Sequence, residues 1–177
     1  MGKTKHRLRL AVRLAVQAIV VLMATVVCAA AQDREPGEIN PIKWSLKPVS
    51  PSKPVEPGEK FTLQLTAEIE DGWHLYSTEE MPQGPKPTRI VLIPDQPFNL
   101  SDIDYPMPQK AIDPNFGAET EFYERSVTFG LAIEVKKDAK PGSSRITVQI
   151  RYQSCTETLC LLPRLVKLDT EIQIAGR

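Results

Sequence analysis

Two cysteines near the carboxyl end of the chain are the residues best suited to chemistry. Cys155 and Cys160 are separated by four residues and flanked on both sides by strand-like sequence. A disulfide closing so small a ring contributes only about 2 kcal/mol by the chain-entropy formula, so it is a weak staple. Short loops at strand ends are exposed, and exposed disulfides exchange readily. The spacing alone leaves a redox-active pair and an inert hairpin clip both open.

The amino terminus has the pattern of a secretory signal peptide. Five Lys and Arg residues are followed by an apolar run from Leu14 to Val27 and by the small residues of a cleavage site. We predict that residues 1–31 are removed, together with Cys28, and that the protein is exported, for example to the periplasm. The alternative is a retained membrane anchor, because the apolar stretch is long enough to span a bilayer.

Removal of residues 1–31 leaves an acidic chain. These residues hold five of the 22 Lys and Arg residues and no Asp or Glu, so 17 basic residues remain against 22 acidic ones. This balance gives no basic surface for nucleic acid or anionic lipid. No other apolar run spans a membrane, so we expect a mature protein without a membrane span, and a monomer. In an oxidising compartment a close cysteine pair forms a disulfide at least part of the time.

The remaining sequence predicts an all-β domain, an antiparallel β-sandwich of immunoglobulin-like type. We assign the proline-containing residues 32–41 to a linker and residues 42–177 to the domain. Between Pro94 and Asn115, five prolines and the lack of a period predict a long loop, which often carries function. Alternating apolar residues predict strands, separated by Pro and Gly turns, at 42–49, 61–69, 73–77, 88–93, 127–135, 146–152 and 166–174.

The register of the hairpin that carries the cysteines predicts a β-bulge. If the two cysteines face each other, Ile150 faces Leu165, yet the apolar residues of the outgoing strand begin at Val166. One extra residue on the outgoing strand, near Pro163 and Arg164, resolves this conflict.

Few other residues have the types or spacing of a catalytic or metal site. Two cysteines and the isolated His74 cannot complete a four-ligand zinc set, and we expect no metal and no cofactor. No partner for acid–base catalysis stands near His74 in sequence, so we expect a histidine packed or hydrogen-bonded at a sheet surface. The adjacent aromatics Phe122 and Tyr123 cannot both point inward in a strand, so at least one is exposed or covers another group.

Three segments taken together resemble the N-terminal periplasmic domain family of the thiol:disulfide interchange protein DsbD. They are Gly-Trp-His-Leu-Tyr-Ser at 72–77, Glu-Phe-Tyr at 121–123, and Tyr-Gln-Ser-Cys at 152–155 with Cys160 and Pro163. The resemblance covers about residues 42–174. It implies an immunoglobulin-like sandwich, in agreement with the pattern of strands. The cysteines are separated by one residue fewer than in the best-known member of the family.

The resemblance implies a redox shuttle. Cys155 and Cys160 match the family's active cysteines, which pass reducing equivalents from a membrane electron donor to thioredoxin-like proteins of the periplasm by thiol–disulfide exchange. Cys160 is then the sulfur that forms the bond to the partner. Because the chain ends at Arg177, before the membrane and thioredoxin domains of full-length members, the donor is expected to be a separate protein. Such a chain is one component of a thiol–disulfide oxidoreductase system.

The resemblance also implies a cap over the disulfide. Glu121, Phe122 and Tyr123 match the family's cap, with Phe122 over the disulfide, and Tyr76 matches a tyrosine that lines the site. The alternative function is a binding module without catalysis, in which the disulfide is structural and the long loop from Pro94 to Tyr123 recognises a protein or cofactor.

Overall fold

The computed structural model describes residues 39–49 and 53–176. The predicted signal peptide at 1–31 and most of the predicted linker at 32–41 therefore lie outside the described residues. One compact unit spans Asn40–Arg177. The described part of the chain contains no helix, and thus none that could cross a membrane.

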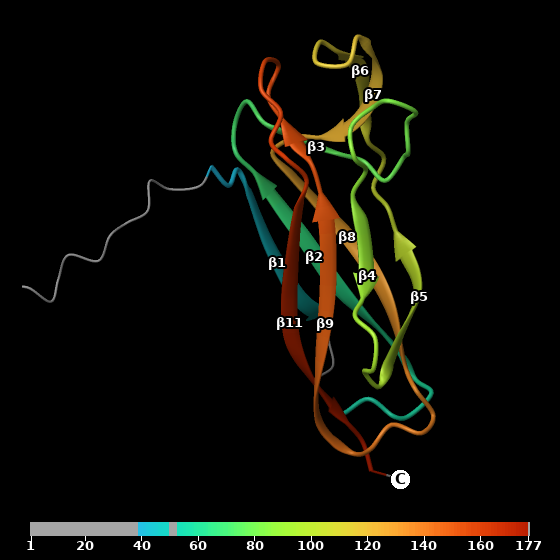
Figure 1. The fold of residues 1–177 in the computed structure, drawn as a ribbon. Helices are drawn as coiled ribbons and strands as arrows, with labels where there is room; N and C mark the ends of the chain where they lie inside the picture. Colours follow the sequence, from blue (N-terminus) through green and yellow to red (C-terminus); the bar gives the residue numbers. More distant parts are fainter. Residues whose placement is uncertain (1–38, 50–52, 177) are drawn as a thin grey trace, which may run out of the picture. The chain divides into compact units, whose positions relative to one another are not determined.

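The described residues form strands that pair into three antiparallel sheets, with the orders β1-β2-β8-β5, β11-β9-β4 and β10-β3-β7-β6. This all-β arrangement confirms the prediction of an immunoglobulin-like β-sandwich (Figure 1). The strands are β1 (Ile42–Val49), β2 (Lys60–Ile69), β3 (His74–Tyr76), β4 (Arg89–Leu92), β5 (Phe98–Asp104), β6 (Gln109–Asp113), β7 (Ala118–Tyr123), β8 (Ser126–Val135), β9 (Gly142–Tyr152), β10 (Ser154–Cys155) and β11 (Arg164–Ile174).

The core follows from the alternation of apolar residues along the long strands. On β2, Leu63 and Leu65 are fully buried and lie opposite Leu131 and Phe129 of β8. Trp44 of β1 packs edge-on against Tyr152 of β9, with ring centroids 5.4 Å apart, so the two larger sheets meet there. Tyr152 is the last residue of β9, and this packing fixes the strand that leads into the cysteines.

The predicted bulge is confirmed. Ile150 lies opposite Val166 in the ladder of β9 and β11, whereas the two cysteines form an isolated antiparallel bridge with each other. Three residues, 161–163, therefore lie opposite Gln153 and Ser154. At this point the chain leaves β9 and enters β10, which pairs with β3 in another sheet. The extra residue thus directs the cysteines away from the sandwich and toward the third sheet.

The prediction of a long loop at 94–115 was wrong. The segment forms β5, which pairs with β8, and β6, which pairs with β7. A register shift between Leu100 and Asp102 interrupts the alternation on β5. The first four residues of β6 are exposed on both faces, so β6 has no apolar period. Both strands lie at the edges of their sheets. Phe98 of β5 is buried in the core, whereas β6 is held by its backbone pairing with β7.

The third sheet positions the candidate site. Figure 1 shows β3, β6 and β7 at one end of the two larger sheets, with the loop that follows β10 beside them. Leu75 of β3 and Tyr123 of β7 are buried in the common core, so one face of this sheet is anchored to the sandwich. The opposite face is free to carry polar and reactive groups.

Replacing Leu65 by alanine should lower the free energy of unfolding by about 2–5 kcal/mol, because removal of its fully buried side chain leaves a cavity in the core. Gln64 is its exposed neighbour on the same strand, and Gln64→Ala should change that free energy by less than about 0.5 kcal/mol. Urea unfolding followed by tryptophan fluorescence measures both. If the two substitutions lowered the free energy of unfolding equally, Leu65 would not lie on the buried face of β2.

Candidate redox site

Cys155 and Cys160 form a disulfide, with their Cα atoms 4.1 Å apart. Their burial differs: Cys155 has an exposed fraction of 0%, whereas Cys160 is partly exposed. The expectation of an exposed disulfide therefore holds for only one of its two cysteines.

Backbone hydrogen bonds close the loop between the cysteines. Thr156 N donates to Leu159 O at 2.8 Å, and Leu159 N donates to the Thr156 hydroxyl oxygen at 3.0 Å. After Cys160, Leu161 N donates to Ser154 O at 3.0 Å. The side-chain amide of Gln153 also donates to Leu161 O, at 3.1 Å. The loop thus has its own hydrogen bonds, so the disulfide is not the only link across the hairpin.

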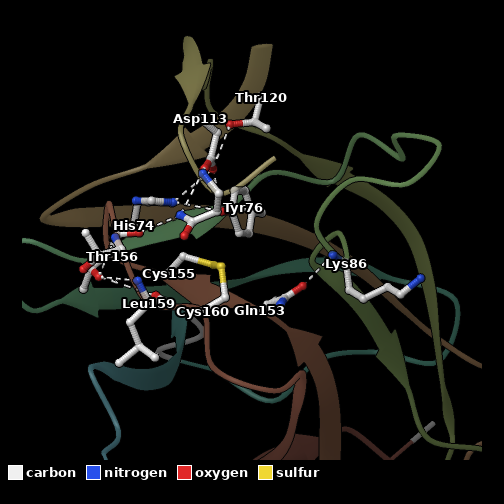
Figure 2. A network of polar contacts seen from close by, with 12 residues as sticks. His74, Tyr76, Lys86, Asp113, Thr120, Gln153, Cys155, Thr156, Leu159 and Cys160 are labelled. Carbon is white, nitrogen blue, oxygen red and sulfur yellow. Dashed lines mark hydrogen bonds and ion pairs between the residues drawn. A yellow bond between two sulfur atoms is a disulfide. The ribbon is translucent and has the colours of Figure 1, made fainter. Parts of the chain in front are cut away.

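Strand register places the functional side chains on one face of the third sheet. Cys155 of β10 lies directly opposite His74 of β3, and Tyr76 lies opposite Phe122 of β7. Since side chains alternate along a strand, His74 and Tyr76 point to the same face, as do directly opposed residues on neighbouring strands. By the same rule Asp113, at the end of β6, lies on this face. Figure 2 shows the rings of His74 and Tyr76 on one side of the disulfide.

A buried carboxylate organises this face. The Tyr76 hydroxyl donates a hydrogen bond of 2.6 Å to Asp113 Oδ2, and His74 Nε2 lies 3.0 Å from the same hydroxyl and 3.5 Å from Asp113 Oδ2. Burial alone would raise the pKa of Asp113, whose exposed fraction is 3%. Hydrogen bonds from Tyr76 and Asn115 and the proximity of His74 outweigh that effect and hold the pKa below its ordinary value. Asp113 is therefore ionised at neutral pH.

The turn between β6 and β7 explains how Asp113 comes to lie there. Asp113 Oδ1 accepts hydrogen bonds from the backbone N of Asn115 at 2.8 Å and from its side-chain Nδ2 at 3.1 Å. The backbone O of Asp113 accepts from the N of Phe116 and the N of Gly117. Gly117 has a φ of 62°, a left-handed conformation that glycine adopts without strain. The sequence Asp-Pro-Asn-Phe-Gly thus specifies this turn through a side-chain cap, a fixed proline φ and a permissive glycine.

The turn contacts the cysteine loop directly. Asn115 Nδ2 donates to Thr156 O at 2.8 Å, one residue after Cys155. The ring of Phe116 packs edge-on against Tyr76, with centroids 6.0 Å apart. Figure 2 shows Asp113, Tyr76 and His74 linked by this network above the disulfide. The turn at residues 113–117 therefore contacts the loop that holds the two cysteines, although the two segments are distant in sequence.

The residues of the predicted cap lie on β7, next to this network. Phe122 is partly buried, and its ring centroid lies 5.0 Å from that of His74. Tyr123 points into the core and donates through its hydroxyl to Pro106 O at 2.8 Å. These positions confirm that only one of the two adjacent aromatics points inward. Glu121 forms an ion pair with Lys110 at 2.7 Å, and the hydrogen bond from Lys110 lowers the pKa of Glu121.

Comparison with known proteins identifies the family. Residues 46–171 match the family described as the N-terminal domain of the thiol:disulfide interchange protein DsbD. This chain belongs to that family. The thiol:disulfide interchange protein DsbD of Haemophilus ducreyi is 30% identical over 115 residues, which are 64% of this chain and 17% of that protein. The N-terminal periplasmic domain of ScsB from Proteus mirabilis aligns with a TM-score of 0.49 at 14% identity, over 77% of this chain and 47% of that one.

Within this DsbD N-terminal domain, sequence reasoning found the cysteines and Tyr76 but missed Asp113 and Asn115. Their signal was the turn sequence Asp-Pro-Asn-Phe-Gly, which would have divided the predicted loop into a hairpin. His74 is hydrogen-bonded at a sheet surface, as predicted, through the Tyr76 hydroxyl at 3.0 Å. Its Nε2 also lies 3.5 Å from Asp113 Oδ2, and Asp113 lies 39 residues away in sequence. Among the described residues, no cluster of three or more His, Cys, Asp or Glu side chains could hold a metal ion.

Replacing Asp113 by asparagine should lower the free energy of unfolding by about 1–3 kcal/mol at pH 7, because buried hydrogen-bond donors lose a charged acceptor. The pKa of Asp113 is lower in the folded protein than in the unfolded chain, so its ionised form stabilises the fold above about pH 4. That stabilisation is lost as the pH falls through the lowered pKa, and the variant should lack this component.

Urea unfolding at several pH values between 2 and 7 tests this prediction. The control is Glu119→Gln, which removes an exposed carboxylate from the neighbouring strand β7. The control should keep the pH dependence of the original protein. An Asp113→Asn variant that also kept it would show that Asp113 does not stabilise the site.

Proposed function

We propose that this domain relays reducing equivalents by thiol–disulfide exchange through Cys155 and Cys160. The observation that carries the proposal is the unequal burial of the two cysteines joined by one disulfide. A partner can attack the accessible sulfur of Cys160 while the buried sulfur of Cys155 leaves and later resolves the complex. An inert clip needs no such asymmetry. Membership of a family of thiol:disulfide interchange proteins supports the same chemistry.

The proposed partners are thioredoxin-like proteins, which receive the electrons, and a separate membrane electron donor, which supplies them. The proposed location is the periplasm, after removal of a signal peptide at 1–31. The basic and apolar amino-terminal sequence, which has the pattern of a secretory signal peptide, supports this assignment. We propose that the mature domain acts as a monomer.

The proposed cap has two parts. Phe122, held between Glu121 and Tyr123 on β7, packs on His74, which lies opposite Cys155. The turn at residues 113–117 is joined to the cysteine loop through the hydrogen bond from Asn115 to Thr156 O. Tyr76 lines the site beneath both parts and donates to the carboxylate at the start of the turn. Together they shield the disulfide from small thiols, and a docking partner displaces them.

The alternative of a binding module with a structural disulfide depended on a long loop after Pro94. Strands β5 and β6 occupy most of that segment. No feature of the described residues favours a binding loop there.

A cysteine variant should trap the partner. Cys155→Ser retains the accessible sulfur and should form a mixed disulfide through Cys160 with a thioredoxin-like protein whose own resolving cysteine is replaced by serine. Cys160→Ser retains only the buried sulfur and should form much less complex. Non-reducing electrophoresis with mass spectrometry of the linked peptide measures both. The double variant is the control, and a lack of complex with both single variants would contradict the proposed shuttle.

Removing either aromatic of the cap should speed reduction of the disulfide by dithiothreitol. An aromatic contact contributes about 1 kcal/mol beyond burial, which corresponds to an open population about fivefold larger. We therefore expect Phe122→Ala and Phe116→Ala each to react about fivefold faster. Val91→Ala removes an exposed apolar side chain from β4 and serves as the control. If one aromatic variant reacted at the original rate, its ring would be excluded from the cap.

A further inference from the structure

His74 lies beside the buried sulfur of the redox pair. His74 and Cys155 are directly opposed residues of β3 and β10. The Cβ atoms of such a pair are about 4.5–5.5 Å apart, with both side chains on the same face. Figure 2 shows the imidazole next to the disulfide. The side chain of His74 has an exposed fraction of 12%, so the ring contacts solvent as well as the site.

The burial of Cys155 creates a requirement for a proton acceptor. When the pair is reduced, Cys155 must become a thiolate before it can attack a mixed disulfide at Cys160. Burial disfavours the charged thiolate. In the disulfide-bonded structure Cys155 has an exposed fraction of 0%, so a side chain beside it is better placed than bulk water to accept the thiol proton.

Of the groups in the network around His74, its imidazole is the best suited to accept the proton. Asp113 is a weak base, because hydrogen bonds from Tyr76 and Asn115 hold its pKa low. Tyr76 already donates its proton to Asp113 Oδ2, and burial raises its pKa further. His74 is a neutral base at pH 7, because burial lowers its pKa below the ordinary value despite the opposing effect of Asp113.

The hydrogen bonds also select the basic nitrogen of the ring. Since the Tyr76 hydroxyl donates to Asp113, its oxygen accepts from His74 Nε2–H, which leaves Nδ1 as the unprotonated nitrogen. Nδ1 forms no hydrogen bond with a described residue. The charged groups that face the ring are the carboxylates of Asp113, Glu124 and Glu157. All three stabilise the imidazolium that forms when Nδ1 takes up a proton.

We propose that His74 is the general base that deprotonates Cys155 when the reduced pair closes its disulfide. This inference rests on the proposed function and assigns a residue to its resolving step. In that step the Cys155 thiol proton moves to Nδ1, and the Cys155 thiolate attacks Cys160 Sγ of the mixed disulfide. The bond between Cys160 and the partner breaks, and the partner's sulfur leaves with the electron pair as a thiolate. The imidazolium then releases its proton to solvent.

A single-turnover reaction with Ellman's reagent isolates this step without any protein partner. One equivalent of the reagent releases one thionitrobenzoate as it forms the mixed disulfide at Cys160 and a second as Cys155 displaces it. His74→Gln keeps an amide donor near the position of Nε2 but cannot titrate. At pH 7 the second release should be slower by about 100-fold, the lower end of the range for general-base catalysis. Thr158→Val, in the exposed part of the cysteine loop, should close at the original rate.

The pH profile separates a proton acceptor from a structural residue. In the original protein the closure rate should fall at a pH that matches the His74 titration followed by NMR, below about 6.5. In His74→Gln the midpoint should move to the higher pKa of the thiol itself. The same rate and midpoint in both proteins, or a midpoint unrelated to the NMR titration, would overturn the inference. If His74 speeds disulfide closure but the domain exchanges disulfides with no thioredoxin-like protein, the inference is supported and the proposed function is contradicted.

Discussion

The carboxylate of Asp113 is the interaction on which the functional end of this domain depends. A buried charge is costly unless hydrogen bonds satisfy it, and Asp113 accepts them from Tyr76 on β3 and from Asn115 in its own turn. Asn115 extends the network to Thr156, next to Cys155. One charged group therefore holds the central strand of the third sheet, the turn and the cysteine loop in a fixed arrangement.

The β-bulge between the cysteines and β11 is the second feature that positions the site. The ladder of β9 and β11 belongs to the sandwich, whereas β10 pairs with β3. This change of sheet brings Cys155 under cover and leaves Cys160 partly exposed. A disulfide continuing the regular ladder would present both sulfur atoms at an edge. The bulge is thus associated with a disulfide in which Cys155 is buried and Cys160 is partly exposed.

The sequence predicted the fold where burial imposes a period. Alternating apolar residues located the strands that form the core, including those around Leu65 and Phe129, and the register conflict located the bulge. The same rule did not locate β5 or β6. On β5 a register shift interrupts the alternation of apolar residues, and on β6 the first four residues are exposed, so burial imposes no period there.

The site was predicted only in part, because its parts are distant in the chain. The cysteine pair is a local motif, and Tyr76 was found through family resemblance. The roles of Asp113 and Asn115 depend on the pairing of β6 with β7 and on contacts across the loop, which no local pattern records. His74 has its hydrogen-bond partner Tyr76 two residues away, whereas strand pairing brings the distant residues Asp113 and Cys155 to it.

The central claim is that the disulfide between Cys155 and Cys160 is redox-active rather than structural. Its equilibrium reduction potential tests this most directly, by titration against dithiothreitol or glutathione with alkylation and mass spectrometry of each cysteine. A shuttle requires a midpoint above about −300 mV, in the range where thioredoxin-like proteins exchange electrons. A midpoint well below that value would mark a structural bridge and contradict the account.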